Sequence, residues 1–368
     1  MILIAMPMAF AEGETYKVGD IVQFGSYPQS EVKDETLIAE LNALAPEWDD
    51  WTSYGYYSGT GDYGTMVQGD WMRYIDVVFK GNKYRGVMFT QYRPYCTYYQ
   101  SSSSSYTHQY DNGYSANTTY WFKFKPIDWR VLDPTTGLVM CETIIDSQPY
   151  NNTIYRTNGD VTYSSFNDAS YTNYASDYET SSIRKWLNDD FYSTAFTDDE
   201  KEEINTTTLN NDGYYTSVGT TGYEKLDSNS TKDKIFLLSY NEARNSNFGF
   251  SLFYSDHDIA RQAQGSDYAK SQGLWVSTTN SYYGNSCWLL RSPGDASYGC
   301  CFVYFDGYSL SYHFAYRAYD GVRPALRFNA GSKIGNLEHD TPEEELNFFQ
   351  KIIKWFKDLF AKLFGWLK

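Results

Sequence analysis

The residues of this sequence that could carry out chemistry are its cysteines, its histidines and a few carboxylates. The five cysteines are Cys96, Cys141, Cys287, Cys300 and Cys301, and the four histidines are His108, His257, His313 and His339. No two cysteines have the Cys-x-x-Cys spacing and the histidines are scattered, so neither a zinc site nor a c-type haem site is indicated. We therefore expect neither a metal nor a cofactor.

The last part of the globular sequence contains three candidate acid–base residues. Asp295, Asp306 and His313 would have to converge to serve a hydrolase, but their neighbours are typical of turns and surface positions. Cys300 and Cys301 are adjacent, so their side chains point apart if the chain is extended. Pairing of Cys287 with Cys300 or Cys301 and independent free thiols are equal alternatives. We expect no catalytic residue.

Residues 286–328 are dominated by aromatic side chains. The whole chain contains 37 Tyr, 22 Phe and 10 Trp, and tyrosine offers a large contact area with a polar tip and few torsions to freeze. Asp306-Gly307 predicts a turn between two alternating segments, which would form a small hairpin. We expect a ligand-binding surface made of Tyr298, Phe302, Tyr304, Tyr308, Tyr312, Phe314 and Tyr316.

The two ends and the turn of this block are expected to form its scaffold. The scaffold residues are Arg291, Pro293, Gly294, Asp306, Gly307, Gly321, Arg323 and Pro324. If residues 301–305 form a strand, Val303 faces inward and Phe302 and Tyr304 face the other way. The alternative is that these rings pack beneath the long loops of the chain.

Length and charge limit the remaining possibilities. The 368 residues suffice for one large domain or two ordinary ones, and the net charge is −16. Nucleic acid is not expected as a partner, because its phosphates would be repelled and the globular part has no basic patch. Residues 1–11 are mostly apolar and end in Ala9-Phe10-Ala11, which indicates the remnant of a signal peptide and hence export. We expect one domain over residues 16–329.

Short strands and helices alternate along the expected domain. Strands are predicted at 18–24, 74–79, 84–89, 120–124, 127–132, 138–141 and 234–238, with Gly81-Asn82 in a hairpin turn and a turn after Phe24. Helices are predicted at 38–44, from Ser181 or Ser182 to Phe191, and after the capping boxes Thr197–Glu200 and Ser239–Glu242. Residues 151–180 and 205–232 are expected to be loops.

Residues 343–368 follow a polar linker, 330–342, and predict an amphipathic helix. Its apolar stripe includes Phe349, Ile353, Trp355, Phe356, Phe360, Leu363 and Trp366. From Leu346 onward the segment carries five lysines and one aspartate, a net charge of +4, which leaves −20 on the preceding residues. A basic face opposite Phe and Trp favours attachment to a membrane surface. Oligomerisation or partner binding through 346–368, or docking on its own domain, are the alternatives.

Six motifs between residues 17 and 328 resemble a family of exported proteins from Gram-positive, largely gut-dwelling bacteria, domain-of-unknown-function family 6273. They are Gly19–Gln29, Pro126–Leu132, Ser182–Asn188, Phe236–Ser239, Trp288–Gly294 and Gly321–Leu326. The resemblance implies a C-type-lectin-like fold, an α+β domain with two main helices and twisted antiparallel sheets. Proteins of this fold bind sugars, proteins or other ligands, usually without catalysis.

Two narrower comparisons refine what the resemblance implies. The Glu-Pro-Asn, Gln-Pro-Asp and Trp-Asn-Asp motifs of calcium-dependent lectins are absent, and Gln148-Pro149-Tyr150-Asn151 departs from them at its third position. The aromatic block before Gly-Val-Arg-Pro is also similar to variable proteins of diversity-generating retroelements. Like their variable positions, Asp295 to Phe328 contains no Trp, Gln, Met, Lys or Glu.

Together these features predict a non-catalytic, adhesin-like binding module, secreted or on the bacterial cell surface, with a protein or glycan as its ligand. One alternative is an oxidoreductase similar to the formylglycine-generating enzymes, which need a cysteine pair that holds copper. The other is a structural cell-envelope protein attached through the terminal helix.

Overall fold

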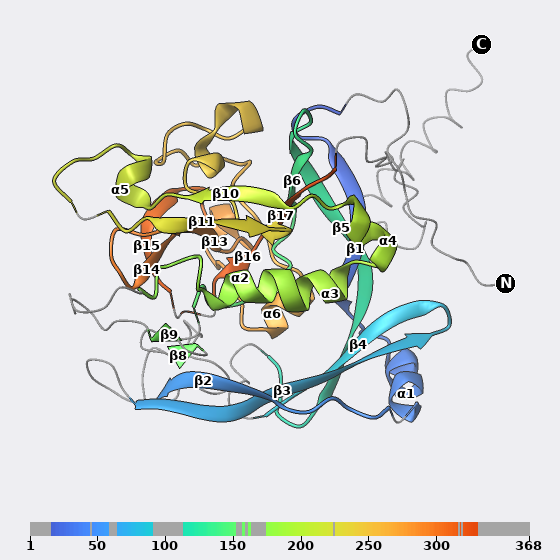
Figure 1. The fold of residues 1–368 in the computed structure, drawn as a ribbon. Coiled ribbons are helices and arrows are strands. Elements are labelled where there is room, and N and C mark those ends of the chain that lie inside the picture. The colour runs from blue at the N-terminus through green and yellow to red at the C-terminus, as the bar shows by residue number, and fades with distance from the viewer. Residues whose placement is uncertain are drawn as a thin grey trace, which may run out of the picture.

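The computed structural model describes residues 16–44, 46–58, 65–90, 113–151, 157–158, 161–162, 174–223, 225–315, 317 and 319–329. The predicted signal-peptide remnant, the linker and the C-terminal helix lie outside these residues, as do Cys96, His108, His339 and Tyr316. Over the part that is described, the chain is a mixed α+β protein built mainly on antiparallel sheets (Figure 1). None of its described helices is long and apolar enough to cross a membrane.

The larger sheet has eight strands in the order β12-β17-β6-β5-β4-β3-β2, and β1 also pairs with β5. The strands are β1 (Ile21–Glu31), β2 (Thr52–Ser58), β3 (Thr65–Phe79), β4 (Asn82–Phe89), β5 (Thr119–Asp133), β6 (Leu138–Cys141), β12 (Ile235–Phe236) and β17 (Ala325–Arg327). The predicted β3–β4 hairpin is confirmed. Its two-residue turn, Lys80 and Gly81, has φ values of 48° and 80°, which match the turn type that suits the twist of a hairpin.

Two predicted interruptions of these strands are wrong. The segments 120–124 and 127–132 join into the single strand β5, and β1 continues through the turn expected after Phe24. The pairing of β1 with β5 shifts register between Gln23 and Ser26, next to Gly25 with its φ of +68°. Such a bulge absorbs one extra residue and lets a strand bend without ending.

The smaller sheet has five strands in the order β15-β14-β13-β16-β7. They are β7 (Asp146–Ser147), β13 (Trp288–Pro293), β14 (Gly299–Val303), β15 (Ser309–Phe314) and β16 (Gly321–Val322). Two ribbons stand apart, β8 (Thr157–Asn158) with β9 (Val161–Thr162), and β10 (Thr207–Asn211) with β11 (Ser228–Asp233). The expectation of a loop over 205–232 is therefore wrong, since it contains β10, β11 and a short helix.

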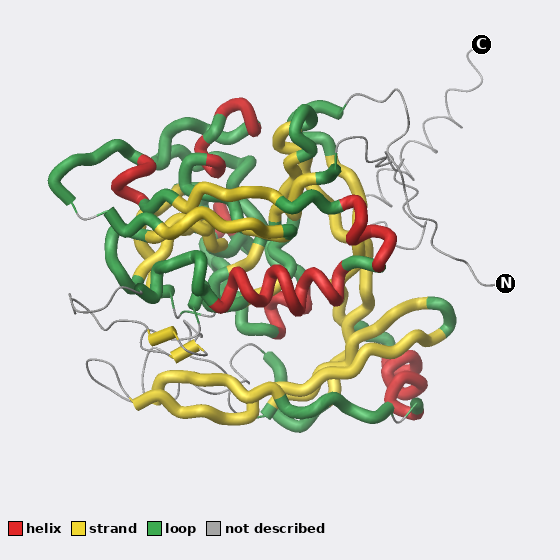
Figure 2. Tube along the Cα trace, viewed as in Figure 1, coloured by secondary structure: helices red, strands yellow, loops and turns green. Residues whose placement is uncertain are grey.

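The helices are short. They are α1 (Glu35–Ala43), α2 (Ser182–Trp186), α3 (Tyr192–Ala195), α4 (Asp198–Glu203), α5 (Tyr214–Ser217) and α6 (Asp267–Ser271). Side chains cap the N-termini of α1, α2, α4 and α6. A π-helical turn, Leu187–Phe191, joins α2 to α3 in one helical run across the middle of the molecule (Figure 2). Ser181 caps α2, and the predicted capping box at Thr197 and Glu200 opens α4.

The second predicted capping box is followed by a single 3₁₀ turn and not by an α-helix. Ser239 and Glu242 exchange both capping hydrogen bonds, at 2.8 and 3.1 Å, but the turn ends at Arg244. The Glu242 carboxylate also pairs with the buried Arg291. The capping hydrogen bonds and the ion pair with Arg291 therefore stabilise a turn here, and no α-helix follows it.

The main core lies around Trp129, which is fully buried on β5 and donates its Nε1 hydrogen to the Phe24 carbonyl at 2.8 Å. Phe196, which follows α3, packs on both rings, with centroid separations of 6.3 Å from Trp129 and 5.3 Å from Phe24. A smaller cluster forms under α1, where Leu41 and Trp121 are buried. Many of the aromatic residues are therefore buried in two separate clusters and are not available at the surface.

A buried carboxylate lies between the two sheets. Asp146 of β7 accepts hydrogen bonds from the Tyr27 hydroxyl at 2.7 Å and from the Ser147 amide at 2.6 Å. Burial raises the pKa of Asp146 from 3.8 to about 6, although these hydrogen bonds oppose the shift. Between pH 4 and 6, Asp146 is therefore protonated in the folded protein but ionised in the unfolded chain. The stabilisation that this bound proton provides is fully present below pH 4 and is lost as the pH rises through 6.

We expect Asp146→Asn to remove this pH dependence. An amide stays neutral and can still accept from the Ser147 amide while donating to the Tyr27 oxygen. We expect urea denaturation to show that the free energy of unfolding of the variant, relative to that of the wild type, rises by about 3 kcal/mol from pH 4 to pH 7, because one pKa unit corresponds to ~1.36 kcal/mol. A stability difference that is constant with pH would contradict this assignment.

Candidate functional site

The predicted hairpin is formed by β14 and β15, and both faces of β14 are buried. Val303 is fully buried and pairs with Trp288 of β13, so it faces inward as expected. Phe302, on the opposite face, is only 4% exposed and stacks on His313 with ring centroids 4.4 Å apart. Its prediction as an exposed ligand-binding residue is wrong, because β14 lies between β13 and β15 and has protein on both faces.

The turn of the hairpin, residues 304–308, is held by its own backbone. The Gly307 amide donates to the Tyr304 carbonyl at 2.9 Å, and the Tyr308 amide donates to the Asp306 carboxylate at 3.1 Å. Gly307 has a φ of +95°, and a Cβ there would lie 2.5 Å from the Asp258 carbonyl oxygen. Only glycine fits, because both the backbone conformation and the neighbouring chain exclude a side chain.

A second segment, residues 251–260, forms a loop against this turn. The Ser309 amide donates to the Tyr254 carbonyl at 3.0 Å, and Gln262 Nε2 donates to the Asp306 carbonyl at 3.2 Å. The close approach of Gly307 to Asp258 belongs to the same contact. Two segments about 50 positions apart in the sequence are thereby joined into one surface.

Arg261 is the residue that joins them. Its side chain is fully buried and donates to five backbone carbonyls, those of Gly307 at 2.6 Å, Ser251 at 2.9 Å, Phe253 and Asp256 at 3.0 Å, and Ala243 at 3.4 Å. Burial lowers the pKa of Arg261, and the Asp258 carboxylate, 3.7 Å away, opposes that shift. The rigid fork of donors on a guanidinium can serve several carbonyls at once.

The loop and the turn carry several large, exposed side chains, and Tyr283 of the neighbouring segment adds another. We call these residues the aromatic surface, and its members are Leu252 (56% exposed), Phe253 (67%), Tyr254 (53%), Ile259 (81%), Tyr283 (71%) and Tyr304 (37%). Exposed apolar side chains in this number on adjoining segments are typical of interaction sites.

Partly buried rings pack against Tyr304 of the aromatic surface. Phe305 contacts Tyr304 with ring centroids 4.3 Å apart, and it also contacts Trp275 at 5.2 Å and Tyr282 at 5.9 Å. This packing restricts the orientation of the Tyr304 ring, which lowers the entropy cost of binding through it.

His257 lies between two of these rings. Its imidazole centroid is 4.5 Å from Tyr308 and 5.6 Å from Tyr282, whose hydroxyl is 3.0 Å from Nδ1. The Asp306 carboxylate lies 3.5 Å from the same nitrogen. Tyr308 is thus half-buried against His257 and contributes to the edge of the surface.

The other predicted ligand-binding rings lie at the opposite end of the hairpin. Tyr298, Tyr312 and Phe314 are half-buried and contact one another, with centroid separations of 5.2–5.8 Å. Tyr316 lies outside the described residues. The structure therefore does not bring all seven predicted rings into one surface: Tyr304 and Tyr308 belong to the turn, and these three form a separate group.

The predicted scaffold residues Arg291 and Arg323 are buried and bind backbone carbonyls. Arg291 donates to the Leu237 carbonyl at 2.8 Å, and Arg323 donates to the carbonyls of Cys141 and Glu142, both at 3.0 Å. Burial lowers the pKa of Arg323 to about 10, which still leaves it charged at neutral pH. Pro293, Gly294, Gly321 and Pro324 are buried beside them.

The residues considered for chemistry are engaged in structural contacts. His313 has its Nε2 2.5 Å from Arg317, and its Nδ1 lies 2.5 Å from the Asp320 carboxylate without hydrogen-bond geometry. Asp306 faces His257 instead. Within the described residues no three His, Cys, Asp or Glu side chains gather as metal ligands would.

The four described cysteines are buried and none of them forms a disulfide. Burial raises the pKa of Cys287, Cys300 and Cys301 well above the ordinary value. Nucleophilic attack and metal binding both use the thiolate, which burial disfavours here.

Sequence reasoning missed most of the aromatic surface. Leu252, Phe253, Tyr254 and Ile259 lie between Gly249 and Arg261, where Ser and Asp interrupt large apolar residues without helical or strand periodicity. Apolar residues in a segment with loop composition are the signal that could have identified them. Tyr283 lies in a similar Ser/Thr/Asn/Gly context.

The fold and the site define an α+β protein that presents a supported aromatic surface at a hairpin turn. Residues 138–329, just over half of the chain, match the family described as Domain of unknown function (DUF6273). The chain belongs to this family, and the matched region contains both the hairpin and the 251–260 loop. No curated protein and no solved structure matches this chain.

Proposed function

We propose that this protein is a non-catalytic ligand-binding module of the bacterial cell exterior, and that the aromatic surface is its binding face. One observation carries the proposal: five large apolar side chains are 37–81% exposed on the loop and the turn that the buried Arg261 joins, and Tyr283 is 71% exposed on a neighbouring segment. Exposed apolar side chains contribute nothing to folding, but they gain free energy when a partner covers them, so they favour association. Fixed aromatic rings are the usual anchors of binding surfaces.

We also propose a fold for this protein and a location outside the cell. A C-type-lectin-like arrangement is supported by the mixed sheets, the few short helices and the large share of irregular chain. In such an arrangement long loops present the ligand site on a rigid scaffold. Export is supported by the apolar start of the sequence with its Ala-Phe-Ala motif.

The oxidoreductase alternative lacks a comparable observation. It would need two thiolates that converge on copper, whereas Cys300 and Cys301 are consecutive in β14 and point to opposite faces. Both thiols also have raised pKa values.

A triple variant tests the binding face. We expect Tyr254→Ser, Tyr283→Ser and Tyr304→Ser together to weaken ligand binding at least tenfold on an array of glycans and cell-surface proteins, because buried tyrosines at interfaces each contribute about 1–2 kcal/mol. The melting temperature should change little, since all three rings are more than one third exposed.

Two exposed residues elsewhere provide matched controls. Tyr223 is 60% exposed after α5, and Val78 is 74% exposed on β3, two residues before Lys80, which pairs with Glu40 of α1. Figure 1 shows α1 across the molecule from β14 and β15. Tyr223→Ser and Val78→Ser should leave binding unchanged. If the triple variant keeps every array signal of the wild type, the aromatic surface is not the binding face.

A further inference from the structure

Paired strands connect the last described residue to the neighbourhood of the aromatic surface. Asn329 follows β17, where Leu326 pairs with Val139 of β6. Val139 in turn pairs with Val131 of β5, whose carbonyl accepts a hydrogen bond from the Gly19 amide at 2.9 Å. These four paired residues lie side by side, so at ~4.8 Å for each strand spacing about 15 Å separates Leu326 from Gly19.

Val18 extends this line to the loop that carries much of the aromatic surface. Its side chain is 41% exposed, and its Cγ1 lies 3.2 Å from the position that a Cβ would take on Gly249. Gly249 stands two positions before the 251–260 loop. Along this path Asn329 and the start of the loop are at most about 45 Å apart, counting ~3.5 Å for each residue and ~4.8 Å for each strand spacing.

The chain after Asn329 is long enough to return to the loop. Residues 330–345 span up to ~55 Å at full extension, which exceeds that distance. Residues 346–368 then carry five lysines, one aspartate and an apolar stripe that includes Phe349, Ile353, Phe356 and Phe360. The amphipathic helix that this sequence predicts gains free energy when another apolar surface covers its stripe.

The aromatic surface offers apolar side chains and negative charge to such a segment. Four of its side chains in the 251–260 loop are 53–81% exposed, and Asp256 is exposed among them. The loop and the turn contain no lysine or arginine, and the adjoining Arg261 is buried. The nearby Arg244 is half-buried, where it donates to the Leu252 carbonyl and stacks on the Tyr240 ring. Lysines beside the apolar stripe would therefore meet a carboxylate, which favours this orientation of the segment.

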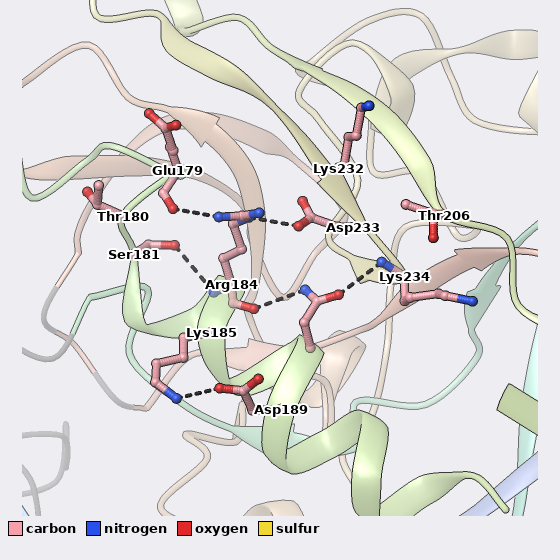
Figure 3. Close-up of a pocket in the computed structure, with 11 residues that line it drawn as sticks. Glu179, Thr180, Ser181, Arg184, Lys185, Asp189, Thr206, Lys232, Asp233 and Lys234 are labelled. Atoms are coloured by element: carbon pink, nitrogen blue, oxygen red, sulfur yellow. Dashed lines mark hydrogen bonds and ion pairs between the residues drawn. The ribbon is translucent and has the colours of Figure 1, made fainter. Parts of the chain in front are cut away.

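Two other surfaces fit this segment less well. The pocket between α2 and the β10–β11 ribbon is lined by four basic and three acidic side chains and by no aromatic or aliphatic residue. Figure 3 shows two of these acids already paired, Asp189 with Lys185 and Asp233 with Arg184. Helix α4 is acidic, but it consists only of Asp, Glu and Lys, so it cannot cover an apolar stripe. The aromatic surface combines exposed apolar side chains with negative charge, which neither of these surfaces does.

Attachment within one chain favours this contact over the same contact between separate molecules. A tether of this length gives an effective concentration on the order of 1 mM, so a contact with a Kd of ~0.1 mM would be formed in about nine tenths of the chains. Separate molecules at ~1 μM would associate through the same contact in only about one per cent of cases.

We propose that residues 346–368 dock on the aromatic surface of their own chain and have to leave it before an external ligand binds. The apolar stripe then covers Leu252, Phe253, Tyr254 and Ile259, and lysines flank Asp256. This regulation rests on the proposed function, since docking controls binding only if the aromatic surface is the binding face.

A photo-reactive side chain in the loop tests the docking in the full chain. With p-benzoylphenylalanine in place of Phe253, we expect irradiation to give a main cross-link to peptides from residues 346–368. The same replacement at Val78, which is 74% exposed on β3, should give at least fivefold less of that product. In a mixture of isotope-labelled and unlabelled chains, both cross-linked peptides should carry the same label.

Variants of the segment itself show whether its apolar stripe makes the contact. Phe349→Ser together with Phe356→Ser should lower the cross-link yield from the Phe253 probe at least fivefold, because the stripe loses apolar area. Asp358→Ser, which changes the polar side of the same predicted helix, is the control and should not lower the yield.

Three results would each overturn the proposal: no cross-link to residues 346–368, equal yields from the probes at Phe253 and Val78, or products that join two differently labelled chains. The last result would assign the contact to a second copy. A higher yield from the same probe at Glu202 would move the docking site to α4 and would contradict the proposal as well.

The array experiment with the triple tyrosine variant tests the proposed function separately. Loss of array binding in that variant without the cross-link to residues 346–368 would leave the binding face and remove this regulation. The cross-link together with unchanged array binding would show that the segment docks on the aromatic surface but that the surface is not the binding face.

Discussion

Replacement of Arg261 by Met should destabilise the protein by about 4 kcal/mol, because removing a buried charge from its partners typically costs ~3–5 kcal/mol. Methionine fills similar space but donates no hydrogen bond, so five buried carbonyls lose their donor. Urea denaturation measures the stability change. Amide hydrogen exchange over residues 251–258 and 304–308 should accelerate more than exchange in β5.

Arg244→Met is the matched control for this prediction. Arg244 also donates to a carbonyl of the same loop, that of Leu252, at 2.8 and 3.1 Å, but it is only half-buried and these hydrogen bonds are exposed. Water can replace these hydrogen bonds, so the loss should be about 1 kcal/mol or less. If the two variants lose equal stability, Arg261 does not hold the loop and the turn together.

Replacement of Gly307 by Ala should cost about 3 kcal/mol and weaken every activity of the aromatic surface. The strain of a non-glycine residue at positive φ contributes ~1–2 kcal/mol, and the overlap with the Asp258 backbone adds ~1–3 kcal/mol. The overlap involves backbone atoms at 2.5 and 2.7 Å, so the 251–260 loop itself must move. Ligand binding and urea denaturation should both report the change.

Gly81→Ala separates these two contributions. Gly81 has a similar φ of +80° in the β3–β4 turn, but an added Cβ there would meet no atom within 4 Å. This variant should therefore lose only the strain, about 1–2 kcal/mol, with binding unchanged. A loss for Gly307→Ala no larger than that for Gly81→Ala would show that the loop does not press on the turn.

Local signals in the sequence predicted elements well where each element is decided by its own residues. The β3–β4 hairpin, the Ser181 cap and the capping box at Thr197 all form as expected, since turn and cap geometry depend on a few neighbouring side chains. Prediction failed where distant pairing overrides local preference. β10 and β11 form in a polar segment expected to be a loop, because each supplies the other with hydrogen-bond partners.

In the candidate site, too, the features that depend on neighbouring residues were predicted correctly, and those that depend on distant contacts were not. Asp306-Gly307 and the neighbouring tyrosines pointed to the hairpin turn, and Tyr304 is exposed there as expected. The alternation in β14 placed Val303 inward correctly, but alternation does not reveal whether the other face meets water or protein. Phe302 is buried for that reason, under contacts such as that with His313, 11 positions away.

The sequence by itself determined the aromatic hairpin, its glycine turn, the buried arginines of the flanking motifs and the family to which the chain belongs. The tertiary structure alone decided which rings are exposed and which segment completes the aromatic surface. Residues 251–260 contact the turn through Arg261, which hydrogen-bonds to carbonyls on both sides of that contact, and through the hydrogen bond from the Ser309 amide to the Tyr254 carbonyl. Such contacts join backbone groups that carry no residue-specific signal, so no sequence pattern records them.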